Sequence, residues 1–184
     1  MAQGTEHSRK SAVFLDRDGV LIHATVRDSV PHPPASVDQV QIIDAAPAAL
    51  NELRRAGHLL IVVTNQPDVA RGAQTREGVD QINRLLMARL PLDQIYVCCH
   101  DTADHCACRK PAPGLLSDAA RQWGIDLAAS FMVGDRWSDV EAGRAAGCTT
   151  ILLDRDYSRR ERCTPNHVVA DLTEAARLIL AYGK

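Results

Sequence analysis

Two aspartates near the N-terminus are the residues of this chain best suited to chemistry. Asp16 and Asp18 follow the short apolar run 13–15, and Gly19 comes directly after them. An apolar run that ends at a polar turn is typical of a buried strand in a parallel sheet, and open α/β sheets bind ligands beyond the carboxyl ends of their strands. Two carboxylates this close repel each other unless a cation lies between them, so the pair predicts a divalent metal site. A solvated turn is the alternative interpretation, because Asp and Gly are both favoured in turns.

Polar residues that could bind a phosphate follow three later predicted strands. They are Thr64, Asn65 and Gln66 after the run 59–63, Lys110 shortly after 94–98, and Asp135 shortly after 131–133. Carboxylates with one cation and several hydroxyl or amide donors suit phosphoryl transfer, in which positioning and charge neutralisation dominate. A metal held by Asp16 and Asp135 would lower the repulsion between a carboxylate nucleophile and an anionic phosphate.

A second group of residues predicts a zinc site. The pairs Cys98-x-His100 and Cys106-x-Cys108 supply three thiolates and one imidazole, which is the ligand set of a closed structural zinc site. Cys99 and His105 are alternative ligands, but alternation along a strand points Cys99 away from the side that Cys98 faces. This zinc loop, residues 98–110, ends at Arg109 and Lys110, so we expect bound Zn²⁺ to hold those two cations in place.

These residues require a sheet whose strands end at one edge. We predict strands at 13–15, 59–63, 94–98, 131–133 and 149–153, separated by helices that begin near Pro47, Thr75, Gly114, Ser138 and Asp171. The Ser138 helix is predicted from a capping box with Glu141, and the proline-containing stretch 22–40 is predicted to be an extended loop. The alternation predicts an α/β fold, a doubly wound and mainly parallel sheet with helices on both faces. We expect one domain over residues 1–184, without a cap domain.

Four segments, in order, carry a resemblance to a known family. F-L-D-R-D-G-V-L, V-V-T-N-Q, R-K-P-A-P-G and V-G-D-R-W-S-D span roughly residues 13–147 and resemble the motifs of the haloacid dehalogenase (HAD) superfamily of phosphatases. The resemblance implies that Asp16 forms an aspartyl-phosphate and that Asp18 is the acid and then the base. It also implies a Mg²⁺ ion held by Asp16, Asp135 and the backbone carbonyl of Asp18, with Thr64 and Lys110 as the phosphate-stabilising pair.

The zinc loop narrows the resemblance to a capless branch of this superfamily. C-x-H followed by C-x-C-R-K-P is similar to phosphatases acting on D,D-heptose 1,7-bisphosphate and on histidinol phosphate. The segment 64–72 is more like the heptose enzymes, whereas the short gap between His100 and Cys106 and the G-D-R at 134–136 are more like the histidinol phosphate enzymes. We expect the heptose bisphosphate, with histidinol phosphate or another small sugar phosphate as alternatives.

Several residues are expected to contact the substrate or to orient the site. Arg109 and Arg136 could bind a second phosphate, because guanidinium groups suit that anion, and Asn65 and Gln66 are also expected to bind substrate. Asp139 has two interpretations: it could orient the metal site, or it could favour the helix dipole.

The composition of the chain limits the kinds of molecule that it can be expected to bind. The net charge of −2 and the aromatic content of 4% do not favour nucleic-acid binding, and they also count against a zinc-binding interaction module on an inactive scaffold, the non-enzyme alternative. Residues 1–11 are polar and lack the apolar core of a signal peptide, and no apolar run is long enough to cross a membrane. We therefore expect a cytoplasmic monomer that acts on a small phosphorylated metabolite.

Overall fold

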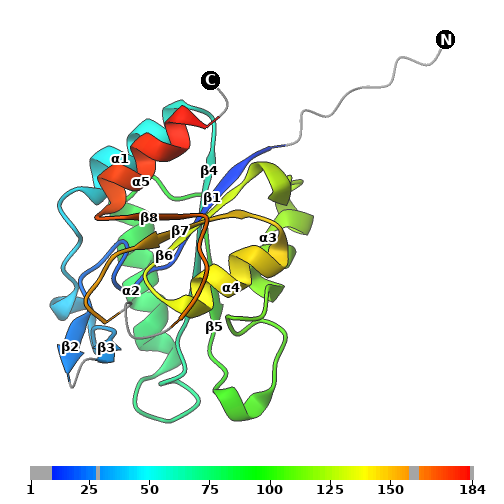
Figure 1. The fold of residues 1–184 in the computed structure, drawn as a ribbon. Coiled ribbons are helices and arrows are strands. Elements are labelled where there is room, and N and C mark those ends of the chain that lie inside the picture. The colour runs from blue at the N-terminus through cyan, green and yellow to red at the C-terminus, as the bar shows by residue number, and fades with distance from the viewer. Residues whose placement is uncertain (1–9, 28–29, 158–161, 183–184) are drawn as a thin grey trace.

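A six-stranded parallel sheet forms the centre of the computed structural model, which describes residues 10–27, 30–157 and 162–182. Its strand order is β5-β4-β1-β6-β7-β8 (Figure 1). The strands are β1 (Ala12–Leu15), β4 (Leu59–Asn65), β5 (Gln94–Cys98), β6 (Phe131–Gly134), β7 (Thr149–Leu153) and β8 (His167–Val169). The five predicted strands are confirmed, and β8 is an additional edge strand. Most of the polar N-terminal stretch, residues 1–9, lies outside the described residues.

The order of the strands creates a crevice between β1 and β6. After β1 the chain adds β4 and β5 on one side, then returns to β6 on the other side and continues to β7 and β8. Leu15 of β1 is in register with Val133 of β6, so the carboxyl ends of the two strands lie next to each other. Neighbouring strands from which the chain departs in opposite directions form the usual ligand site of an open α/β sheet. Asp16 and Asp135 follow these two strands.

Helices cover both faces of the sheet, as predicted (Figure 1). Helices α1 (Ala46–Arg55), α2 (Arg76–Arg89) and α5 (Leu172–Ala181) pack on one face, and α3 (Gly114–Trp123) and α4 (Trp137–Ala146) pack on the other. Alternate residues of the central strands β4, β1 and β6 enter the two cores: in β1, Val13 enters the first core and Phe14 the second. Both are fully buried, which explains why β1 is apolar throughout.

The stretch 22–40 differs from the prediction of an extended loop. It contains β2 (Thr25–Arg27) and β3 (Val30–His32), which pair as an antiparallel hairpin, and a 3₁₀ turn at Val37–Gln39. Proline lacks the N–H that a central strand needs, but it is tolerated in a two-stranded ribbon whose outer sides are unpaired, and this is where Pro31 lies. No further described element lies between β1 and α1, so the hairpin is the largest structure in that connection.

The start of α4 also differs from the prediction. The helix begins at Trp137 rather than after Ser138, and the carboxylate Oδ2 of Asp139 accepts a hydrogen bond of 3.1 Å from the backbone N–H of Arg136. The Ser138–Glu141 capping box is therefore wrong, because Asp139 occupies the third helical position and closes the first turn itself. The predicted cap at Thr75 is confirmed, since its Oγ1 accepts from the N–H of Gly78 at 3.0 Å.

Candidate active site

A pocket of about 560 Å³ lies at the carboxyl ends of the strands. It has the size of a site for a small metabolite. Predicted site residues that line it are Asp16, Asp18, Asn65, Cys106, Arg109, Lys110 and Arg136. His32 and Pro33, at the end of the hairpin, form part of its wall. The pocket therefore combines residues from five separate parts of the chain.

Lys110 is the cation at the base of the pocket and is almost completely buried. Its Nζ lies 2.8 Å from Oδ1 of Asp16 and 2.6 Å from Oδ1 of Asp139, and it donates to the carbonyl of Val63 at 2.7 Å. Burial opposes the charge of this lysine, but the carboxylates of Asp139 and Asp16 outweigh that effect and raise the pKa of Lys110 above its ordinary value. Lys110 is therefore held as an ammonium group beside Asp16.

Three buried carboxylates surround this ammonium group. One oxygen each of Asp16, Asp135 and Asp139 lies within 4.8 Å of the others. Burial, followed by the charges of Asp16 and Asp139, raises the pKa of Asp135, and burial is also the main reason that the pKa of Asp139 rises to about 6. One lysine cannot balance three carboxylates, so the site as a whole attracts further positive charge.

The same three residues suit a hard divalent cation. Oδ1 of Asp135 is buried and, among the described residues, has no hydrogen-bond partner. Carboxylate oxygens are the ligands that Mg²⁺ prefers, and it commonly uses one or two of them together with water and substrate phosphate. The residues present therefore fit the predicted ion at Asp16 and Asp135, and Asp139 lies beside them as a third carboxylate bound to Lys110.

Asp18 lies beside this group but has different partners. Its carboxylate accepts from Nε and Nη2 of Arg17 at 3.1 and 3.2 Å, and from Nε2 of Gln66 at 2.7 Å. Arg17 is fully buried, and its Nη1 donates to Oδ1 of Asn83 on α2 at 3.1 Å. Burial raises the pKa of Asp18, and the adjacent Arg17 opposes that shift. The two aspartates of the first motif are thus held by separate cations, Lys110 and Arg17.

The three polar residues at the end of β4 have different positions. Thr64 is buried, and its Oγ1 accepts from Nε2 of Gln66 at 2.8 Å. Gln66 is also fully buried and lies behind Asp18 rather than on the pocket wall. Asn65 does line the pocket, but its amide forms two bonds with the backbone of Lys110, at 3.0 and 3.1 Å. Asn65 therefore fixes the segment that carries Lys110.

The predicted zinc ligands meet in one cluster. Cys98, His100, Cys106 and Cys108 place their ligand atoms within 4.8 Å of one another, and the three Sγ–Sγ distances are 3.2, 3.4 and 3.7 Å. Sulfurs at about 2.3 Å from a tetrahedral zinc would be about 3.8 Å apart, so the cluster is close to the size that a zinc ion needs. Cys99 points elsewhere, as predicted, since Nη1 of Arg76 donates to its Sγ at 3.6 Å.

This cluster is connected to the pocket through the backbone. Nη1 of Arg109 donates to the carbonyl of His100 at 3.2 Å, and the N–H of Gly114 donates to the carbonyl of Ala107 at 3.1 Å. A Cβ on Gly114 would lie 2.2 Å from that carbonyl oxygen, so this close approach requires glycine. These two bonds therefore tie the zinc loop to itself and to the start of α3, close to Lys110.

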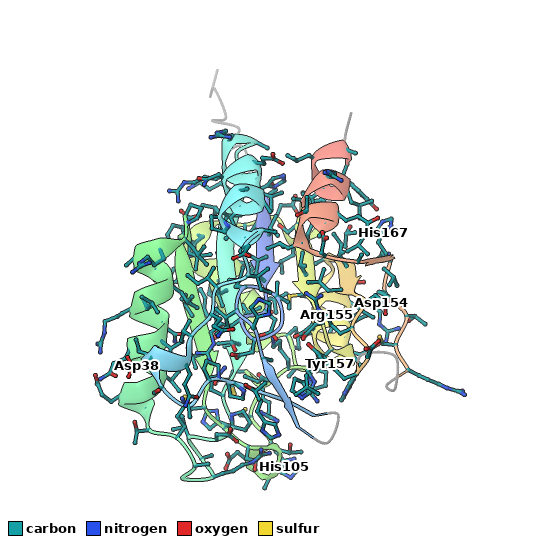
Figure 2. All side chains as sticks on the ribbon, turned by 90° about the vertical axis from the view of Figure 1, so that its left-hand side faces the viewer. Asp38, His105, Asp154, Arg155, Tyr157 and His167 are labelled. Carbon is teal, nitrogen blue, oxygen red and sulfur yellow. The ribbon has the colours of Figure 1, made fainter. Side chains whose placement is uncertain are left out.

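Tyr157, which contacts a carboxylate of the site, was not predicted from the sequence. Tyr157, on the segment between β7 and β8 (Figure 2), donates a hydrogen bond to Oδ2 of Asp135. The residues around it form no recognisable motif, and an isolated tyrosine carries no signal of its position. The role of Asp139, which sequence left open, becomes clearer because it both contacts Lys110 and caps α4.

Comparison with known proteins agrees with this geometry. Residues 107–175 match the HAD-hydrolase-like family model. The chain is 34% identical to D-glycero-beta-D-manno-heptose-1,7-bisphosphate 7-phosphatase of Pasteurella multocida, over 92% of this chain and 97% of the relative. It is 37% identical to the protein of the same name from Photorhabdus laumondii, over 92% of this chain and 89% of the relative. The chain belongs to the HAD-like hydrolases.

A solved structure extends the likeness to this family. D,D-heptose 1,7-bisphosphate phosphatase of B. bronchiseptica, determined with magnesium and phosphate, superposes with a TM-score of 0.79 at 30% identity, over 92% of this chain and 98% of that one. The predicted superfamily, the predicted sheet and the predicted class of enzyme, a phosphatase, are confirmed. Among the described residues, no helix is both long enough and apolar enough to cross a membrane.

Proposed function

We propose that this HAD-like phosphatase removes the 7-phosphate of D-glycero-D-manno-heptose 1,7-bisphosphate with the help of Mg²⁺. The observation that carries the proposal is the cluster of Asp16, Asp135 and Asp139 around Lys110 at the β1–β6 crevice. The names of the relatives support the substrate, and the magnesium and phosphate in the B. bronchiseptica structure support the ion.

In the first step, a carboxylate oxygen of Asp16 attacks phosphorus. The bond from Asp16 to phosphorus forms while the bond from phosphorus to the sugar oxygen breaks, and Asp18 gives its proton to that leaving oxygen. Lys110 and Thr64 would hold the phosphoryl oxygens as their charge redistributes. Asp16, Asp135 and the carbonyl of Asp18 would hold Mg²⁺, which would supply positive charge that reduces the repulsion between the carboxylate and the phosphate.

In the second step, Asp18 acts as a base. It takes a proton from water, the water oxygen attacks phosphorus of the aspartyl-phosphate, and the bond to Asp16 breaks. Inorganic phosphate leaves and Asp16 is again a carboxylate, while Asp18 is protonated for the next cycle. The raised pKa of Asp18 supports this role, because a group that must carry a proton in one step needs a pKa nearer to neutral.

The remaining predicted residues would recognise the rest of the substrate. Arg109 and Arg136 line the pocket and suit the second phosphate, because a guanidinium group can form two parallel bonds to phosphate oxygens. Asn65 also lines the pocket, whereas Gln66 would act through Asp18. Zn²⁺ bound by Cys98, His100, Cys106 and Cys108 would hold the loop that ends at Lys110.

Cysteines that gather as a metal-ligand cluster rather than as disulfides support a reducing compartment such as the cytoplasm. The monomeric state remains a prediction.

The decisive experiment compares kcat/KM for both anomers of heptose 1,7-bisphosphate with kcat/KM for histidinol phosphate, in the presence of Mg²⁺. We expect a clear preference for the heptose and no turnover by Asp16→Asn with either substrate. A preference for histidinol phosphate would overturn the proposed substrate but leave the aspartyl-phosphate mechanism in place. Full activity of Asp16→Asn would contradict the aspartyl-phosphate mechanism.

A further inference from the structure

The segment that follows β7 reaches back to the acidic cluster. Tyr157 donates from its hydroxyl to Oδ2 of Asp135, and Nη2 of Arg155 donates to the carbonyl of Gly19 at 3.1 Å (Figure 2). These two contacts join the segment to both sides of the crevice, since Gly19 follows β1 and Asp135 follows β6. Neither the four motifs nor the zinc loop includes this segment.

Gly19 allows the close packing of these groups. It has a φ of +90°, and a Cβ at this position would lie 1.9 Å from Oδ2 of Asp135 and 2.8 Å from the hydroxyl of Tyr157. The backbone of Gly19, the carboxylate of Asp135 and the phenol of Tyr157 are therefore in direct contact, and only glycine leaves the necessary space. Oδ2 of Asp135 is thus enclosed between Gly19 and Tyr157, which leave it little room to move.

The two oxygens of Asp135 consequently differ. Oδ2 has a hydrogen-bond donor, whereas Oδ1 is buried and has no such partner among the described residues. Carboxylates that bind metal ions are commonly oriented by a hydrogen bond from a residue behind them, and loss of that bond typically weakens metal binding. A fixed Oδ2 leaves Oδ1 as the oxygen available to an ion.

We propose that Tyr157 is a positioning residue for the divalent cation, acting through Asp135. This inference rests on the proposed function, because it requires a cation at Asp16 and Asp135. A tyrosine is well suited to the task because its hydroxyl is neutral. It orients the carboxylate without cancelling the negative charge that attracts the ion, as a lysine in that place would do.

The test is isothermal titration calorimetry with Mg²⁺, without substrate, on full-length protein that is free of Mg²⁺ and retains zinc in the zinc loop. We expect Tyr157→Phe, which removes only the hydroxyl, to raise the Kd for Mg²⁺ about 10-fold or more. Tyr182→Phe is the matched control: Tyr182 is 51% exposed at the end of α5, and its hydroxyl contacts only His167 among the hydrogen bonds of the described residues. We expect that control to bind Mg²⁺ like the wild type.

Two further variants make the result interpretable. Asp135→Asn should abolish measurable Mg²⁺ binding, which shows how much affinity is lost when the carboxylate itself is removed. Arg155→Met keeps the phenol but removes the bond to Gly19, and we expect a smaller loss of affinity in the same direction. This second variant also tests the segment if Tyr157→Phe does not fold. A purely structural role of Tyr157 would lower the melting temperature of the Mg²⁺-free, zinc-containing protein without changing the Kd for Mg²⁺ of the folded fraction.

The outcomes separate this inference from the proposed function. If Asp135→Asn loses Mg²⁺ while Tyr157→Phe binds it as tightly as the wild type or more tightly, Tyr157 does not position the ion, and the proposed function stands. If the wild type does not bind Mg²⁺, or if Asp135→Asn binds it normally, both proposals fail together.

Discussion

At the scale of single residues, the two aspartates of the first motif differ because their partners differ. Asp16 faces Lys110 and two further carboxylates, whereas Asp18 is held by the fork of Arg17 and by Gln66. A buried arginine that forms two bonds to one carboxylate fixes its orientation as well as its charge. The different partners support the proposed roles, nucleophile for Asp16 and acid and base for Asp18.

The division of roles predicts the effect of Asp18→Asn. The amide keeps the shape of the carboxyl group but cannot transfer a proton, so we expect kcat to fall about 10²-fold or more. The inhibition constant of inorganic phosphate should stay close to that of the wild type, because Lys110 is retained. Asp38→Asn is the matched control, since Asp38 is exposed in the 3₁₀ turn at Val37–Gln39. An unchanged kcat for Asp18→Asn would remove Asp18 from proton transfer.

At the scale of elements, α2 supports the first motif from behind. Asn83 is a buried polar residue of this helix, and its side-chain oxygen accepts from Nη1 of the fully buried Arg17 at 3.1 Å. Helix α2 is otherwise packed through apolar residues such as Ile82 and Leu86. The hydrogen bond from Arg17 to Asn83 thus connects the apolar face of α2 to the guanidinium group that holds Asp18.

Replacement of Asn83 by leucine should therefore be costly. It leaves a buried guanidinium N–H without an acceptor, and we expect the free energy of unfolding to fall by about 1–3 kcal/mol. Urea denaturation measures this change. Gln81→Ala, at an exposed position of the same helix, should change stability by less than about 0.5 kcal/mol. Equal stabilities of the two variants would show that Arg17 does not depend on α2.

The zinc loop allows a second prediction at this scale. Cys106→Ser should release zinc and raise KM, because the loop that presents Arg109 and Lys110 would lose a ligand that holds it. Metal analysis of the purified protein and steady-state kinetics measure both effects. Cys99→Ser is a closely matched control, since Cys99 adjoins His100 but its Sγ contacts Arg76 instead. A Cys106→Ser protein with full zinc content and normal KM would contradict the proposed role.

At the scale of the whole molecule, the sequence predicted five of the six strands of the sheet and brought most residues of the candidate site to its carboxyl edge. Strand ends are readable because a buried parallel strand is apolar throughout and stops abruptly at polar residues, as at Asp16 and Asp135. The hairpin β2–β3 was missed because Pro31 excludes a central strand but not an edge ribbon, and β8 because three residues, with Val168 59% exposed, give no pattern. Tyr157 was missed because its contact depends on how the segment after β7 folds back.

Stability of the whole molecule should depend on His58, at the opposite end of the sheet from the pocket. Its Nδ1 is paired with Oγ of Ser11 at 2.8 Å, its ring meets Phe131 edge-on at 5.9 Å, and burial lowers its pKa. A His with a lowered pKa in the folded state binds its proton more readily after unfolding, so folding stability falls as the pH drops below about 6.5.

The variant His58→Gln should remove this part of the pH dependence. We expect the difference in unfolding free energy between wild type and variant to be constant above about pH 7.5 and to shift in favour of the variant below about pH 6.5. Urea denaturation at a series of pH values measures the difference. His23→Gln, at an exposed position, is the control and should follow the wild type. Parallel curves for His58→Gln and wild type would contradict the prediction.

The strand order has a consequence for how the protein is made. β1 is synthesised first but lies between β4 and β6. The carboxylates of Asp16, Asp135 and Asp139 come from the turns after β1 and β6 and from α4. A growing chain that ends before α4 carries Asp16 but lacks Asp139, so the cluster is incomplete. A cation site made of these three carboxylates can therefore form only after residue 139 has been made, and a shorter incomplete chain would lack the proposed catalytic centre.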